Sequence, residues 1–208
     1  MYILKGLYVI TDQKLIPRDR FIEIIEKVIQ GGAKIVQLRE KDSPDEEIIR
    51  LGKKLLKITK RHGIPLIIND SPKLAVEVGA DGVHLGMDDP AIMEARRLLG
   101  SEAIIGVSCY GEIERGLRAE REGADYLAFG TPFFTPTKPG RRPTPFEVLR
   151  EAKRRITKIP VFAIGGITKG NAKSVLETGV DGIAVITAVF SSPNPEEAAR
   201  SLAEFFEK

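Results

Sequence analysis

The chain has 208 residues, of which 42% are hydrophobic and 29% charged, and it contains 20 Gly and 13 Pro. This composition is ordinary for a globular protein and excludes a chain that is disordered along its length. The 32 basic and 29 acidic residues leave a net charge of only +3, which argues against a nucleic-acid binder with a basic surface. At about 150 residues per domain, the length favours one domain that spans residues 1–208.

The sequence predicts a reducing compartment and no membrane partner. A single cysteine, Cys109, cannot form an internal disulfide, and no Cys/His cluster has the spacing of a zinc site. Residues 1–6 are too short an apolar run for a signal peptide, and no stretch reaches the roughly 18 apolar residues of a membrane span. We therefore expect a cytoplasmic protein.

Short apolar runs alternate eight times with longer charged segments. The runs predict strands at residues 7–10, 35–38, 65–68, 82–85, 103–107, 126–129, 160–164 and 182–186. Apolar residues at helical spacing predict helices at residues 21–29, 48–58, 92–99 and 196–206. Glycines stand where the ends of helices need a left-handed residue, namely Gly31, Gly32, Gly63, Gly79, Gly123 and Gly179.

The alternation predicts an α/β fold, a closed (β/α)8 TIM barrel. Eight units in 208 residues allow about 26 residues each, which is close to the minimum for a strand, a helix and two turns. A doubly wound open sheet is the alternative, because it has the same local alternation. It fits less well, since no Gly-x-Gly-x-x-Gly motif follows the first strand, which runs instead into Thr11 and Asp12.

The second predicted strand ends in a polar segment, Gln37-Leu38-Arg39-Glu40-Lys41. Active sites of barrels lie at the carboxyl ends of the strands. Because side chains alternate along an extended chain, Gln37, Arg39 and Lys41 point one way and the other two residues point the opposite way. Two cations and an amide on one face predict an anion site, with an ordinary charged strand end as the alternative.

Carboxylates follow the third and fourth strands. Asp70 comes after Asn69, and Asp89 follows the strand that contains His84. Mg²⁺ takes one or two carboxylates together with substrate phosphates, so Asp70 and Asp89 are candidate ligands. Both residues also precede prolines that suit the start of a helix, so helix capping is the alternative.

The remaining strand ends predict a flap and a second anion site. Ser108 follows the fifth strand, and the loop at residues 130–143 carries four prolines, three hydroxyls and three cations, a composition that fits a semi-rigid flap or an ordinary surface loop. Gly165 and Gly166 follow the seventh strand, while Ile186 ends the eighth and Thr187 opens a short helix, as in the usual phosphate site of a barrel. Two anion sites on one face suggest group transfer from a diphosphate to a monophosphorylated acceptor.

The ordered set of motifs resembles the thiamine phosphate synthase family over essentially the whole chain. The segments that carry this resemblance are residues 8–12, 37–41, 69–70, 82–86, 105–108, 135–138 and 163–167. The resemblance implies a transferase that joins hydroxymethylpyrimidine diphosphate to hydroxyethylthiazole phosphate, uses Mg²⁺ and releases pyrophosphate.

The resemblance also implies a set of site residues. The pyrimidine diphosphate is expected at Gln37, Leu38, Arg39, Glu40, Lys41, Asn69, Ser108 and Lys138, and Mg²⁺ at Asp70 and Asp89. The thiazole phosphate is expected at Thr135, Pro136, Thr137, Gly166, Ile186 and Thr187. Arg39, Lys41, Ser108 and Lys138 are the expected catalytic residues.

The chain departs from the family pattern at Met87, where Gln is frequent, and at Tyr110, where His is frequent; Thr187 replaces a commoner Ser and keeps the hydroxyl. The nearest rival is a thiazole tautomerase, whose catalytic His falls where this chain has Thr131. A phosphate-ligand sensor on the same fold is a rival from another class. His84 is expected as a packed barrel residue, His62 at a helix end and Cys109 as a small buried residue.

Overall fold

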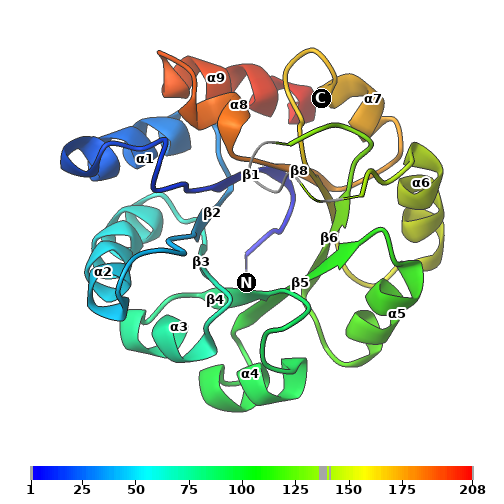
Figure 1. Ribbon diagram of the computed structural model, residues 1–208, viewed down its shortest axis with the longest axis horizontal. Coiled ribbons are helices and arrows are strands. Elements are labelled where there is room, and N and C mark those ends of the chain that lie inside the picture. Colours follow the sequence, from blue (N-terminus) through cyan, green and yellow to red (C-terminus); the bar gives the residue numbers. More distant parts are fainter. Residues whose placement is uncertain (1, 136–139, 141, 208) are drawn as a thin grey trace.

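The computed structural model describes residues 2–135, 140 and 142–207 (Figure 1). Within these ranges, eight parallel strands close into one barrel in which each strand pairs with the next in sequence and β8 pairs with β1. The strands are β1 (Gly6–Ile10), β2 (Ile35–Leu38), β3 (Leu66–Asn69), β4 (Gly82–Leu85), β5 (Ile104–Tyr110), β6 (Tyr126–Gly130), β7 (Val161–Ile164) and β8 (Gly182–Val185). The predicted (β/α)8 barrel is confirmed, and the open sheet was the wrong alternative.

Helices form a ring around the barrel (Figure 1). They are α1 (Phe21–Gln30), α2 (Asp45–Arg61), α3 (Pro72–Val78), α4 (Ile92–Leu99), α5 (Ile113–Arg121), α6 (Phe146–Arg155), α7 (Ala172–Leu176), α8 (Thr187–Phe190) and α9 (Pro195–Ala203), with 3₁₀ turns at Arg18–Arg20 and Glu204–Phe206. No helix in the described part of the chain is long and apolar enough to span a membrane.

Two predicted helices differ from the observed ones at their ends. Helix α2 begins at Asp45, before the predicted start, because three acidic residues in its first turn favour the positive end of the helix dipole. Helix α9 ends at Ala203, and the chain continues as a 3₁₀ turn through Phe206, a tightening that is common at helix ends.

The glycines at the predicted turns behave as expected, with one exception. Gly32, Gly63, Gly79, Gly123 and Gly179 all have positive φ. Gly31 has a φ of −72° and is needed for a different reason, since a Cβ there would lie 2.4 Å from the Glu196 carbonyl oxygen. Close packing of α1 against α9 therefore explains this glycine.

Apolar side chains fill two layers, one inside the barrel and one between the barrel and the helices. The inner layer contains three aromatic rings, Tyr8, Tyr126 and Phe162, whose centroids lie 5.5–5.7 Å apart in edge-to-face contacts. Gly106 makes room for one of them, because a Cβ there would lie 2.0 Å from Tyr126 Cζ. The barrel is therefore a packed core, and a site can open only at its end.

Three aspartates fix strand pairs at the amino-terminal end of the barrel. Each one stands directly before a strand and accepts a hydrogen bond from the backbone N–H at or near the start of the preceding strand. The pairs are Asp81 with Leu66 at 2.9 Å, Asp125 with Ile105 at 2.7 Å, and Asp181 with Val161 at 2.8 Å. We call these residues the aspartate clasps.

Candidate active site

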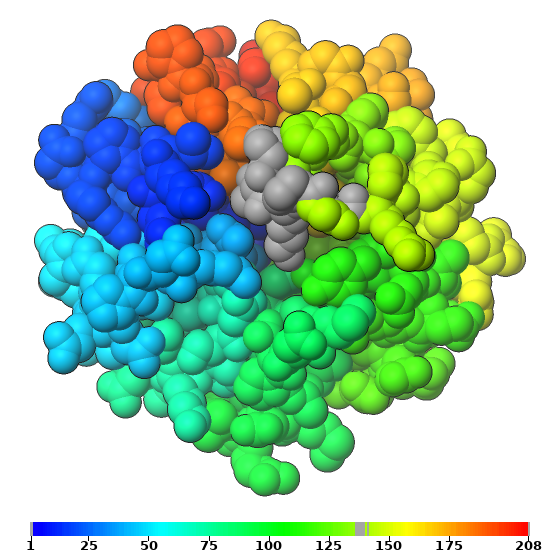
Figure 2. Space-filling view, viewed as in Figure 1, coloured from blue at the N-terminus to red at the C-terminus, as the bar shows by residue number. Residues whose placement is uncertain are grey.

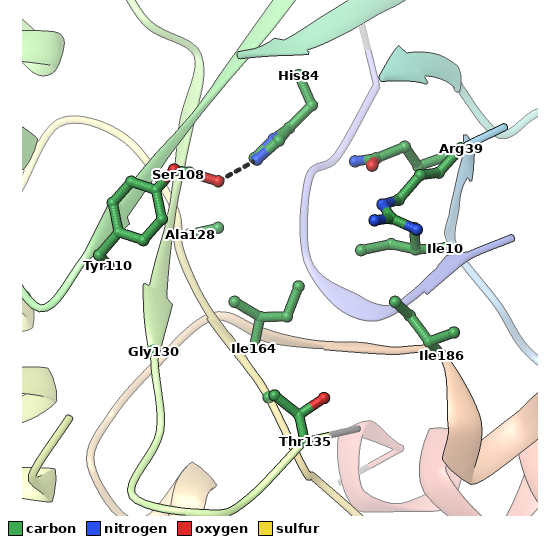
Figure 3. Close-up of a pocket in the computed structure, with 12 residues that line it drawn as sticks. Ile10, Arg39, His84, Ser108, Tyr110, Ala128, Gly130, Thr135, Ile164 and Ile186 are labelled. Carbon is green, nitrogen blue, oxygen red and sulfur yellow. Dashed lines mark hydrogen bonds between the residues drawn. The ribbon is translucent and has the colours of Figure 1, made fainter. Parts of the chain in front are cut away.

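A cavity opens at the carboxyl ends of the strands (Figure 3). Figure 2 shows this face of the molecule, where loops that follow different strands gather around the barrel axis. Among the predicted site residues, the cavity brings together Gln37, Arg39, Ser108, Thr135 and Ile186. Arg39 lies across the cavity from Ser108 and His84 (Figure 3). The strand order thus collects residues that are far apart in sequence.

One wall of the cavity is the end of β2. Gln37 is buried and its Nε2 donates a hydrogen bond to Tyr8 Oη at 2.6 Å. The backbone N–H of Arg39 donates to Thr11 Oγ1 at 2.9 Å, and the Arg39 guanidinium lies 3.8 Å from the Asp12 carboxylate. The segment after β1 therefore holds Arg39 in place, a role that the sequence did not reveal.

Leu38 and Glu40 point away from the cavity, as the alternation predicted. Leu38 is packed between the barrel and the helices. The Glu40 side chain is buried, pairs with Arg18 and accepts a hydrogen bond from Ser43 at 3.3 Å. Burial raises the pKa of Glu40, although the hydrogen bond from Arg18 opposes this shift. Only the backbone of these two residues is available to a ligand in the cavity.

Ser108 on β5 contacts His84 on β4, with 2.9 Å between Ser108 Oγ and His84 Nε2 (Figure 3). His84 is buried inside the barrel, as predicted, but it also lines the cavity. The sequence predicts only the packing of His84, because the pairing of β4 with β5 that brings His84 to Ser108 cannot be seen in it.

The two candidate metal ligands lie close together. Asp89 Oδ2 accepts a hydrogen bond from the Gly86 N–H at 2.5 Å, and Asp70 Oδ2 lies 3.2 Å from Lys41 Nζ. Burial raises the pKa of Asp89, and the neighbouring Asp70 carboxyl raises it further. Two adjacent carboxyl groups fit Mg²⁺, which takes its other ligands from phosphates and water; the described residues contain no cluster of three or more ligating side chains.

Helix capping does not account for these aspartates. The residue that caps α3 is Ser71, whose Oγ accepts from the Leu74 N–H at 3.2 Å, and α4 begins after Ala91. Asp70 has a φ of 65°, a left-handed conformation that is uncommon for a residue other than glycine. Asn69 ends β3 and lies in register with His84.

The predicted phosphate side of the site includes the glycine turn after β7. Gly166 has a φ of 61°, and a Cβ there would lie 2.2 Å from the Phe134 carbonyl oxygen. The absence of a side chain is therefore required by packing against the loop after β6. Thr131 also ties this loop to the turn, because its buried hydroxyl donates to the Gly165 carbonyl.

Ile186 lines the main cavity, while Thr187 begins α8 and lines an adjoining cavity with Arg39 and Lys41. Helix α8 is one turn of four residues, so its dipole is small. Pro136, Thr137 and Lys138, which were predicted in the flap, lie outside the described residues.

Arg115 on α5 braces two parts of the site. Its Nε donates to the Ser108 carbonyl oxygen and its Nη2 donates to the Gly86 carbonyl oxygen, both at 2.7 Å. The guanidinium thus joins β5 to the turn that holds Asp89. Nothing in the sequence pattern pointed to this residue.

The remaining predictions concern Cys109, the two departures from the family pattern and His62. Cys109 is buried, and burial raises the pKa of its thiol to about 12, so it is protonated at neutral pH. Tyr110 lines the cavity with a φ of 56°, and Met87 is half exposed. His62 stands at the carboxyl end of α2, as predicted.

A family model described as thiamine monophosphate synthase matches residues 7–189. The chain belongs to this family. It is 47% identical to the thiamine-phosphate synthase of Methylococcus capsulatus over 97% of this chain and 89% of that protein. It is 43% identical to the thiamine-phosphate synthase of Clostridium acetobutylicum, and the match covers 97% of this chain and 95% of that protein.

Structural similarity agrees with the family. A thiamine phosphate pyrophosphorylase from Pyrococcus furiosus superposes with a TM-score of 0.88 at 40% identity, over 97% of this chain and 95% of that one. An orotidine 5′-phosphate decarboxylase from Pyrococcus horikoshii, at 17% identity and a TM-score of 0.67, shows only that the fold is shared. The activity of the chain is therefore that of a thiamine-phosphate synthase, a transferase of thiamine biosynthesis, and the tautomerase and sensor alternatives are not favoured.

Proposed function

We propose that the chain transfers a pyrimidinyl-methyl group from hydroxymethylpyrimidine diphosphate to the ring nitrogen of hydroxyethylthiazole phosphate and releases pyrophosphate. The observation that carries this proposal is that Lys41 lies beside the adjacent carboxyl groups of Asp70 and Asp89, 3.2 Å from Asp70 Oδ2, and lines a cavity together with Arg39. The glycine turn after β7 and Thr187, which lines a cavity with Arg39 and Lys41, are the groups we assign to a second phosphate.

The diphosphate is assigned to the end of β2. Arg39 and Lys41 supply positive charge, and Gln37, Asn69 and Ser108 supply hydrogen-bonding groups for the pyrimidine. Lys138 completes the set by family resemblance, together with the backbone of Leu38 and Glu40. Mg²⁺ held by Asp70 and Asp89 would supply further positive charge to the diphosphate oxygens.

The thiazole phosphate is assigned to the ends of β7 and β8. Gly166, Ile186 and Thr187 follow these strands, and Thr135 from the loop after β6 joins them, with Pro136 and Thr137 by family resemblance. The glycine turn offers backbone N–H groups, and the Thr187 hydroxyl offers a further donor.

The reaction needs no protein nucleophile, because departure of pyrophosphate leaves a pyrimidinyl-methyl cation that the thiazole nitrogen captures. The protonated thiol of Cys109 is consistent with this chemistry. The chain contributes mainly by neutralising the charge that develops on the leaving group. By analogy with the loss of one oxyanion-hole donor, we expect each contact removed to cost roughly 10²–10³ in rate.

The direct test is to incubate the purified chain with both substrates and Mg²⁺ and to measure thiamine phosphate by fluorescence after oxidation. Arg39→Ala should mainly raise KM for the pyrimidine diphosphate, and Thr187→Val, which removes only a hydroxyl, should raise KM for the thiazole phosphate. Arg97→Ala, an exposed arginine on α4, serves as the matched control. If both site variants weakened the same single substrate, the assignment of two sites would be wrong.

A further inference from the structure

A continuous chain of hydrogen bonds crosses the barrel beneath the cavity. Gln37 Nε2 lies 2.6 Å from Tyr8 Oη, which lies 2.8 Å from Tyr126 Oη. Tyr126 Oη lies 2.9 Å from His84 Nδ1, and His84 Nε2 lies 2.9 Å from Ser108 Oγ. Both ends of this series of hydrogen bonds, Gln37 on β2 and Ser108 on β5, line the cavity.

The three middle residues of this series of hydrogen bonds, Tyr8, Tyr126 and His84, are tightly packed. Tyr8 and Tyr126 are almost wholly buried, and His84 stacks on the Tyr126 ring with 5.5 Å between centroids. The missing side chain of Gly106 provides the space for the hydroxyl end of Tyr126. Burial raises the pKa of both phenols, so each keeps its hydrogen at neutral pH.

The direction of donation follows from the group at one end. Gln37 donates from Nε2, so Tyr8 Oη accepts there; because the buried Tyr8 hydrogen needs an acceptor, we direct it to the other partner of Tyr8, Tyr126 Oη. Tyr126 must then donate to His84 Nδ1, which therefore carries no hydrogen. A neutral imidazole in that state has its hydrogen on Nε2, and this hydrogen points at Ser108 Oγ.

We propose that Tyr8, Tyr126 and His84 form a relay of fixed direction that commits the Ser108 hydroxyl to donating its hydrogen to the substrate. Because Ser108 Oγ accepts from His84, its own hydrogen is directed to another acceptor, and the cavity supplies one when the pyrimidine diphosphate is bound. His84, Tyr8 and Tyr126 are positioning residues, since they act through Ser108. The substrate assignment in this inference rests on the proposed function, whereas the direction of the relay does not.

The state of His84 can be measured without any substrate. The chain has only two histidines, so long-range ¹H–¹⁵N correlation spectra of histidine-labelled protein contain two imidazole patterns, and His62→Gln identifies that of His84. We expect the pattern of the neutral Nε2–H tautomer at neutral pH. The Nδ1–H tautomer or an imidazolium ion would overturn the proposal, whether or not the protein forms thiamine phosphate.

A double-mutant cycle tests whether the relay acts through Ser108. Tyr126→Phe removes the donor to His84 Nδ1 and should raise KM for the pyrimidine diphosphate by roughly three- to tenfold, the effect of one hydrogen bond. In a Ser108→Ala background the same change should leave KM unaltered. Tyr2→Phe is the matched control, because Tyr2 donates to Asp81 at the amino-terminal end of the barrel.

The outcomes separate the possible failures. Equal effects of Tyr126→Phe with and without Ser108 would show a merely structural role for Tyr126 and overturn the relay. Absence of turnover in the wild-type chain together with an Nε2–H tautomer would instead overturn the proposed function and leave the direction of the relay supported.

Discussion

Arg115→Ala offers a sharp test of how the site is held together. The substitution removes two charge-assisted hydrogen bonds, from Nε to the Ser108 carbonyl and from Nη2 to the Gly86 carbonyl. It also removes a cation–π contact with Tyr110, whose ring centroid lies 6.0 Å from the guanidinium carbon. Hydrogen bonds to charged groups contribute about 1.5–3 kcal/mol each, so we expect a loss of about 3 kcal/mol after allowance for partial exposure.

For a protein of this size, that loss corresponds to a fall in Tm of about 6–12 °C. The measurement is thermal unfolding, with Arg118→Ala as the control because Arg118 is exposed on the same helix, α5. We also expect kcat/KM to fall further in Arg115→Ala than in the control, because Ser108 and the Asp89 turn lose their common brace. Equal Tm values for the two variants would refute the reasoning.

Three other predictions follow from the site and its surroundings. Turnover should stop in EDTA and return with Mg²⁺; full activity in the chelator would contradict the assignment of Asp70 and Asp89. Burial raises the pKa of Glu40 above 4.5, so stability should fall as pH rises from this value through the higher folded-state pKa, and Glu40→Gln should flatten that part of a Tm profile. Thr131→Ala should lower stability by about 1–2 kcal/mol, because the buried Gly165 carbonyl loses its donor, yet it should retain substantial synthase activity; an unchanged denaturation midpoint would contradict this.

The barrel could be predicted from the sequence because its information is local. Strands buried on both faces are nearly continuous apolar runs, and helices between them repeat at another period, so each element is visible by itself. The alternation of side chains along residues 37–41 is equally local. In the structure Gln37 and Arg39 line the cavity, whereas Leu38 packs in the core and Glu40 is buried against Arg18.

The contacts that position the site could not be predicted in this way. His84 meets Ser108 because β4 and β5 pair with one particular stagger, and Arg115 reaches two carbonyls from a helix outside the barrel. The packing of Gly166 was equally invisible in the sequence, since a Cβ there would lie 2.2 Å from the Phe134 carbonyl oxygen. Such contacts join segments that are far apart in the sequence, and the hydrophobic periodicity of each segment does not show how the segments are placed relative to one another.

The aspartate clasps divide the labour between the two ends of the barrel. They tie β3 to β4, β5 to β6 and β7 to β8 at the end remote from the cavity, through backbone N–H groups that every residue except proline possesses. These bonds fix the register of the strand pairs without contacts from the loops at the cavity end. For protein engineering, this makes the amino-terminal end of the barrel a scaffold. The loops after β6 and β7, at the other end, can then be exchanged while the strand order is preserved.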